Sequence, residues 1–125
     1  MKNTKSVIAL CVAISTLTGC SKALSKEEIS KLSIKEAATE VCEAYKTLDA
    51  DRIIAFLEDK DVQKTKEKLE NGINYSARDK LEQSICTVTS VKEERRYTVV
   101  KFENFVKKIK IYKDENKLYK IKSLF

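Results

Sequence analysis

Histidine, tryptophan and proline are absent from this 125-residue chain, and glycine occurs only twice. The lack of histidine matters most for function, because histidine is the commonest general base near neutral pH and a favoured zinc ligand. Several catalytic mechanisms are thereby removed, although an enzyme that relies on other side chains is not excluded. The length suits one domain with a modest core rather than two domains. We expect no cofactor and no metal.

Positive charge is concentrated in the C-terminal third of the chain. The whole sequence has 25 lysines and arginines against 19 acidic residues, a formal net charge of +6. Residues 92–125 alone contain 11 basic and five acidic residues. Such a basic region favours contact with anionic surfaces.

The N-terminus combines a basic start, an apolar run and a cysteine. Two lysines without any acid precede the run 7–18, which ends in Leu17-Thr18-Gly19-Cys20. About a dozen apolar residues are too few to cross a bilayer as a helix but suit a signal peptide. The ending resembles the lipobox of bacterial lipoproteins, which implies a signal peptide over 1–19, cleavage between Gly19 and Cys20, a diacylglycerol on Cys20 and often N-acylation, for example with palmitate. The alternatives are an ordinary signal peptide or a buried apolar helix.

The lipobox resemblance also predicts where the protein resides. Each buried methylene contributes about 0.8 kcal/mol, so two or three acyl chains would hold the chain to the membrane. Ser21, rather than an aspartate, follows Cys20. By resemblance to proteobacterial sorting signals, this favours the cell outer membrane, facing the periplasm of a Gram-negative bacterium. Nucleic acid is not an expected partner for an exported, lipid-anchored domain.

Two cysteines remain once the leader and the lipidation site are set aside. Cys11 lies in the leader and Cys20 would receive the lipid, which leaves Cys42 and Cys86. In an oxidising compartment this pair is expected to form a structural disulfide bond. Two buried free thiols are the alternative, and a redox pair is disfavoured because no C-x-x-C spacing occurs.

The first half of the mature chain has helical patterning. Residues 20–32 are polar with few apolar positions and are interpreted as a lipidated tether. Ser33 and Glu36 form a capping-box pattern, which predicts a helix ending near Thr47. Asp49 or Asp51 is expected to cap a second short helix. A charged segment, 58–70, precedes Asn71-Gly72, a plausible helix stop, and residues 76–83 predict another short helix.

The second half has the alternation of strands. Four segments rich in β-branched and aromatic residues follow, at 85–91, 97–102, 105–112 and 117–124, separated by short polar turns. The sequence therefore predicts an α+β domain over 33–125, in which N-terminal helices pack on a C-terminal four-stranded antiparallel meander sheet. One parity of the last two strands is apolar and is expected to face the helices; the other parity is rich in lysine. The apolar set is Phe105, Ile109, Ile111, Tyr119 and Ile121.

This order of elements resembles small bacterial lipoproteins with a nuclear transport factor 2-like domain, also described as cystatin-like, including a lumazine-binding-like group of unknown function. The resemblance rests on the helical segments 35–46 and 48–57 and on the closing hairpin around Asp114–Lys117. Members often have a tryptophan before the last strand, where this chain has Leu118 and Tyr119. Enzymes of the superfamily commonly use aspartate and histidine in a cone-shaped pocket, so their catalysis does not transfer to a chain without histidine.

Three groups of side chains are candidates for a binding site. The first is a lysine cluster on the polar parity of the last two strands, which Lys101 could extend. This cluster would suit phosphate-bearing lipid, lipopolysaccharide or another anionic envelope polymer. The alternative is a solvated sheet face without a binding role. The cluster comprises Lys108, Lys110, Lys120 and Lys122. Aromatic residues are candidates for lining a pocket between the first helix and the sheet, with plain core as the alternative. They are Tyr45, Phe56, Phe102 and Tyr119.

An acidic group is rejected as a calcium site, because the spacing of an EF-hand loop is absent and helix capping explains two of its members. The group comprises Asp49, Asp51, Glu58, Asp59 and Asp61. The sequence thus favours a membrane-anchored envelope lipoprotein that binds a ligand or a protein partner without catalysis. An inhibitor, immunity or exclusion lipoprotein is the first alternative. A small hydrolase or isomerase is the second, and would need residues such as Tyr45, Asp79 and Glu82 to converge in a cavity.

Overall fold

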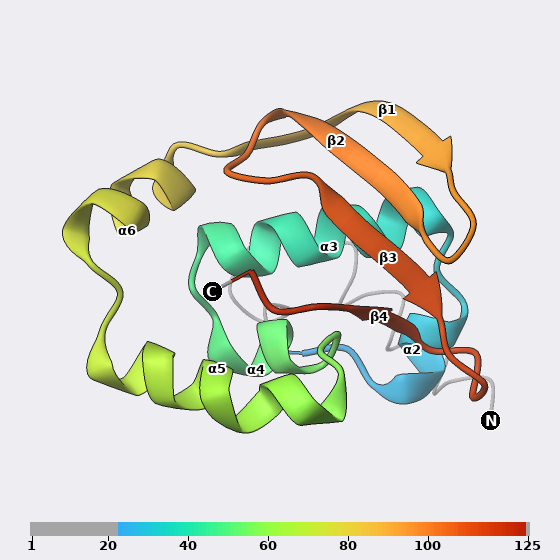
Figure 1. Ribbon diagram of the computed structural model, residues 1–125, viewed down its shortest axis with the longest axis horizontal. Coiled ribbons are helices and arrows are strands. Elements are labelled where there is room, and N and C mark those ends of the chain that lie inside the picture. The colour runs from blue at the N-terminus through green and yellow to red at the C-terminus, as the bar shows by residue number, and fades with distance from the viewer. Residues whose placement is uncertain (1–22, 125) are drawn as a thin grey trace, which may run out of the picture.

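The computed structural model describes residues 23–124. Helices precede a four-stranded antiparallel sheet of order β1-β2-β3-β4, so the α+β class and the meander predicted from the sequence are confirmed (Figure 1). The predicted signal peptide, the cleavage site at Gly19 and the lipidation site at Cys20 lie outside the described residues.

The described helices include a central one, over 34–46, that contacts the sheet and two of the other helices. Their bounds are α2 Lys26–Ser30, α3 Ile34–Lys46, α4 Ala50–Ile54, α5 Asp59–Asn71 and α6 Tyr75–Glu82. α3 begins as predicted, because the Ser33 side chain accepts from the Glu36 amide while the Glu36 carboxylate accepts from the Ser33 amide. Asp49 caps α4, and Gly72 ends α5 with a φ of 91°, a conformation that glycine adopts readily. α6, predicted over 76–83, begins one residue earlier and is capped by Asn74.

The core lies between α3 and the inner face of the sheet. The strands are β1 Ile85–Glu93, β2 Thr98–Asn104, β3 Ile109–Lys113 and β4 Tyr119–Ile121. The predicted inward parity is confirmed for the strand residues Ile109, Ile111, Tyr119 and Ile121, each at most 5% exposed. They pack in one buried cluster with Val41 and other residues of α3. The alternating pattern therefore positions Lys110 of β3 and Lys120 of β4 on the opposite face.

The predicted tether over 20–32 is wrong from residue 26 onward, because this stretch is part of the folded domain. α2 begins with a second capping box, formed by Ser25 and Glu28. Ile29 is 2% exposed and belongs to the core cluster, and the Leu32 carbonyl accepts a hydrogen bond of 2.9 Å from the Tyr119 hydroxyl. α2 is therefore anchored both by burial and by a bond to β4.

The strand boundaries around residue 105 also differ from the prediction. β2 continues through Asn104, which pairs with Ile85 and donates a side-chain hydrogen bond to the Gln83 carbonyl. The reversal between β2 and β3 must then use residues 105–108, so Phe105 lies in a loop and not in the third strand. Lys108 lies in the same loop and not on the strand face where the alternation placed it.

The predicted disulfide bond is present and joins α3 to β1. The Cα atoms of Cys42 and Cys86 are 5.8 Å apart, and Cys42 is fully buried. In the described sheet, β1 is an edge strand whose only strand neighbour is β2. The bond therefore fixes this edge to the central helix, and Val88 of the same strand packs against the core.

Replacing both Cys42 and Cys86 by alanine should lower the free energy of unfolding substantially. The bridge closes a loop with a sequence separation of 44 residues, for which the chain-entropy estimate is about 4 kcal/mol. Urea denaturation of the oxidised protein and of the double variant measures the difference. Treating the original protein with a reductant should reproduce the variant's curve, and coincident oxidised and reduced curves would contradict a stabilising bond.

Candidate functional site

The pairing between β3 and β4 stops early, and a cavity opens where the two segments separate. Their register ends at the pair Ile111–Ile121, so the residues after Ile121 no longer bond to β3. Helices hold this C-terminal segment instead: the hydroxyls of Ser123 and Thr65 share a hydrogen bond of 2.8 Å, and the Ser123 amide donates to the Asp61 carboxylate at 3.1 Å. The Leu124 amide donates to the Tyr45 hydroxyl at 3.3 Å. The segment is thereby bound to α5 and α3.

The resulting cavity, here called the lysine basin, has a volume of about 360 Å³. Among residues 23–124, its lining includes four lysines, two tyrosines and no aspartate or glutamate. The lining consists of Tyr97, Lys107, Lys108, Ile109, Lys110, Tyr112, Ile121, Lys122, Ser123 and Leu124. Among residues 23–124 the ion pairs are Arg52–Glu40, Lys60–Glu58 and Lys92–Glu94, none of which involves a basin lysine. Within this part of the chain, no ion pair therefore balances the positive charge of the basin.

The basin brings together three of the four predicted lysines. Lys110 comes from β3, Lys122 follows β4, and Lys108 reaches it from the preceding loop. Lys120 lies elsewhere, because its ammonium group donates to the Leu57 carbonyl at 3.3 Å. Lys101, the possible fifth member, lines a neighbouring cavity of about 520 Å³ that shares Lys107, Lys108 and Lys110 but not Lys122.

Sequence reasoning missed Lys107, Tyr97 and Tyr112 as basin residues. Strict alternation placed Lys107 on the face opposite Lys108, whereas a loop allows both neighbours to reach one cavity. The Lys107 ammonium group donates to the Leu124 carbonyl at 3.3 Å, across the mouth between loop and C-terminal segment. The Lys110 ammonium lies 5.1 Å from the centre of the Tyr97 ring, a cation–π distance.

Tyr112 is held in place by a carboxylate from the helical layer. Its hydroxyl donates to the Glu58 side chain at 2.5 Å. Burial together with this hydrogen bond raises the pKa of Tyr112 to about 12, because both favour the neutral phenol over the phenolate. The hydroxyl is thus occupied by Glu58, and the ring is the part of Tyr112 left for the basin.

The four aromatic residues predicted to line a pocket belong to the buried core. Tyr45, Phe56 and Tyr119 are at most 5% exposed, and all four pack in the core cluster. Phe102 is 8% exposed and borders the cavity next to Lys101. The alternative interpretation as plain core is therefore what the structure shows, with Phe102 alone reaching a cavity. Burial raises the pKa of Tyr45, although its bonds to the C-terminal segment oppose that effect.

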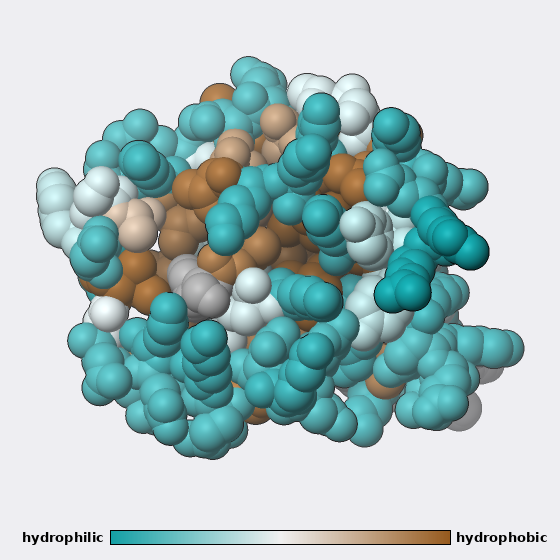
Figure 2. All heavy atoms as spheres, in the orientation of Figure 1, coloured by the Kyte–Doolittle hydropathy of each residue, from teal (hydrophilic) through white to brown (hydrophobic). Residues whose placement is uncertain are grey.

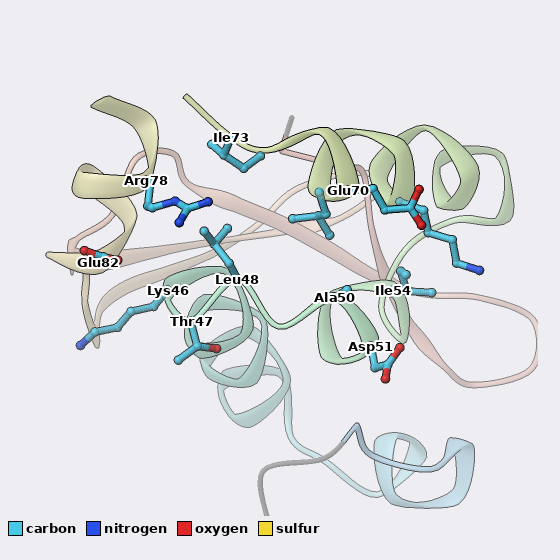
Figure 3. A pocket seen from close by; sticks show the side chains of 12 residues that line it. Lys46, Thr47, Leu48, Ala50, Asp51, Ile54, Glu70, Ile73, Arg78 and Glu82 are labelled. Carbon is cyan, nitrogen blue, oxygen red and sulfur yellow. The ribbon is translucent and has the colours of Figure 1, made fainter. Parts of the chain in front are cut away.

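A larger cleft of about 860 Å³ lies among the helices (Figure 3). Leu48, Ile54 and Ile73 are part of its wall, and Figure 3 shows the Arg78 side chain directed between Leu48 and Ile73. The lining carries charges of both signs. The basic residues are Lys46, Lys66 and Arg78, and the acidic residues are Asp51, Glu70 and Glu82. Because the signs balance, this cleft selects no class of charged ligand.

The acidic side chains make local contacts instead of gathering around a shared point. Asp49 caps α4, Glu58 accepts from Tyr112, and Asp61 accepts from Ser123. Within residues 23–124 no group of three or more aspartate, glutamate, histidine or cysteine residues is arranged to hold a metal ion. Glu82 borders the helical cleft while Tyr45 is in the core, so these two candidates for an enzyme do not meet in one cavity.

Apolar surface is exposed on the side of the molecule that carries the sheet. Figure 2 shows hydrophobic atoms between α6 and β3, framed by hydrophilic side chains. A further cavity of about 330 Å³ there is lined by Leu81, Val106 and Leu124, among others. None of the helices in the described part of the chain is long and apolar enough to span a bilayer.

Comparison with known proteins gives no relative. No protein family, no curated protein and no solved structure matches the chain.

The raised pKa of Tyr112 predicts a pH dependence. Because burial, and after it the bond to Glu58, raises the pKa of Tyr112 from 10.0 to about 12, the neutral phenol contributes fully to the stability of the fold below pH 10 and loses this effect as the pH rises to 12. In an absorbance titration of phenolate formation, Tyr112→Phe should remove one late-ionising tyrosine. Tyr75→Phe is the matched control, since Tyr75 is 82% exposed. Loss of an early-ionising tyrosine from the Tyr112 variant would contradict the bond.

Proposed function

We propose that the chain is a lipid-anchored envelope protein whose nuclear transport factor 2-like domain binds an anionic ligand without catalysis. The lysine basin carries this proposal: in the described part of the chain, four lysines and no aspartate or glutamate line one cavity. A concave site of one sign of charge raises the local concentration of oppositely charged ligands. The scatter of the candidate catalytic residues supports a binding role over an enzymatic one.

The proposed anchor would keep the domain close to the bilayer. Four residues separate Cys20 from Ser25, the residue that caps α2. At full extension this connection spans at most about 18 Å. The domain would then sit next to the lipid headgroups, where anionic phosphate groups are abundant.

Cys20→Ala tests the anchor. The variant should accumulate as an unlipidated precursor that incorporates no palmitate in metabolic labelling, because a thiol is needed to form the thioether. Cys11→Ala is the matched control, since it removes the cysteine of the predicted signal peptide and keeps the lipobox. Normal labelling of the Cys20 variant, or a mature N-terminus elsewhere by mass spectrometry, would contradict the proposal.

Charge reversal tests the anionic ligand. A fragment of residues 21–125, which contains every helix and strand described, should bind phosphatidylglycerol-containing vesicles more strongly than phosphatidylcholine vesicles. Replacing Lys108, Lys110 and Lys122 by glutamate should reduce that binding about tenfold or more, and less at high salt.

A matched variant separates the basin from overall charge. It replaces three exposed helical lysines by glutamate and therefore has the same net charge. These residues are Lys35, Lys64 and Lys68. Equal losses in the two variants would mean that binding follows net charge alone, and the basin would not be the binding site.

A further inference from the structure

The lysine basin has features that restrict its ligand beyond the sign of charge, and the inference drawn from them rests on the proposed function. The first is its size. A volume of about 360 Å³ is near the lower end of small-molecule sites, which run from about 300 to 1,000 Å³. One headgroup or small molecule fits such a cavity, whereas a polymer would contact it with a single unit.

The second feature is the density of positive charge. Four ammonium groups surround the cavity, and of their Nζ atoms only that of Lys107 makes a hydrogen bond to a described residue, the carbonyl of Leu124. A phosphate monoester carries a charge of about −1.5 to −2 at neutral pH, whereas a carboxylate or a phosphodiester carries −1. The dianion matches this lining best, and lysine ammonium groups bind phosphate as compact point charges.

The third feature is the apolar and aromatic part of the wall. The rings of Tyr97 and Tyr112 line the cavity together with Ile109 and Leu124. Glu58 holds the Tyr112 hydroxyl, and Lys110 lies over the Tyr97 ring, so both rings are fixed by contacts within the protein. A ligand whose phosphate is attached to an apolar or aromatic body would contact both parts of the wall.

The neighbouring cavities fit this ligand less well. The helical cleft carries acids and bases in equal number. The cavity next to Lys101 shares three basin lysines but includes neither tyrosine. Lys122 belongs to the basin alone and Lys101 to its neighbour alone, so these two exposed residues distinguish the cavities.

We propose that the lysine basin is a binding site for a phosphate monoester joined to an apolar or aromatic body, with the ammonium groups holding the phosphate and the tyrosine rings contacting the body. A phosphatidate-type lipid headgroup and a soluble phosphoester share this chemistry.

Phenyl phosphate is the probe, titrated into the 21–125 fragment and followed by backbone amide chemical shifts. Shift changes should concentrate on residues 107–112 and 121–124. Lys122→Gln should raise the dissociation constant about five- to tenfold, the effect of one ammonium group beside a dianion. Lys101→Gln, which removes the same charge from the same domain, should change it less than about twofold. Equal effects of the two variants would overturn the proposal.

Two further ligands test the charge and the apolar body. Benzenesulfonate keeps the ring but has one negative charge, so it should bind about tenfold more weakly than phenyl phosphate. Inorganic phosphate should also bind more weakly than phenyl phosphate, because it has no apolar body. Tyr97→Leu should reduce this difference in affinity between the two ligands. Affinity for benzenesulfonate equal to that for phenyl phosphate would refute selection of a dianion.

The source of the phosphate is decided by competition. Phosphatidylcholine vesicles containing phosphatidate should displace phenyl phosphate if the ligand is a lipid headgroup; displacement only by soluble phosphoesters would identify a soluble ligand of the same class.

The variants show whether this inference fails by itself or together with the proposed function. If the Lys101 and Lys122 variants bind phenyl phosphate equally well while the triple glutamate variant still loses vesicle binding, this inference is refuted and the proposed function stands. If the triple glutamate variant keeps its vesicle binding and Lys122→Gln keeps its affinity for phenyl phosphate, both this inference and the proposed function are refuted.

Discussion

The hydrogen bonds that hold the C-terminal segment to the helices decide the shape of the candidate site. Ser123 and Leu124 bond to α5 and α3 rather than to β3. If the β3–β4 ladder continued beyond Ile121, Lys110 and Lys122 would stand on a filled sheet. Because the ladder stops, the same lysines border a cavity. Whether the residues after Ile121 pair with β3 or bond to the helices thus decides whether these lysines form a solvated basic face or a concave basic site.

The architecture could be predicted from the sequence wherever the signal was local. The capping box of Ser33 and Glu36 marked the start of α3, and the alternation of β3 and β4 identified their buried parity. The disulfide bond followed from counting the cysteines that remain once the predicted leader and the predicted lipidation site are set aside. The same capping-box signal was present at Ser25 and Glu28, so α2 was readable from the sequence and was missed because so few apolar residues follow it.

The candidate site was predictable only in part, because its geometry depends on contacts between distant segments. A period of two gives the face of a strand residue but not the position where the strand ends. Lys107 and Lys108 meet in the basin only because β2 extends to Asn104 and shifts the reversal to 105–108. The Thr65–Ser123 bond joins residues 58 positions apart, and no local pattern indicates it.

A basin of exposed lysines is suited to weak binding, and the proposed anchor would make weak binding sufficient. Exposed charge pairs contribute about 0–1 kcal/mol each, because water and salt screen them. A connection of at most about 18 Å between Cys20 and α2 would confine the domain near the bilayer, and such confinement corresponds to an effective concentration in the millimolar range. A membrane-borne phosphate would then occupy the basin even with a millimolar dissociation constant. A soluble phosphoester would gain nothing from the anchor, so it would need a higher affinity or a higher concentration in the envelope.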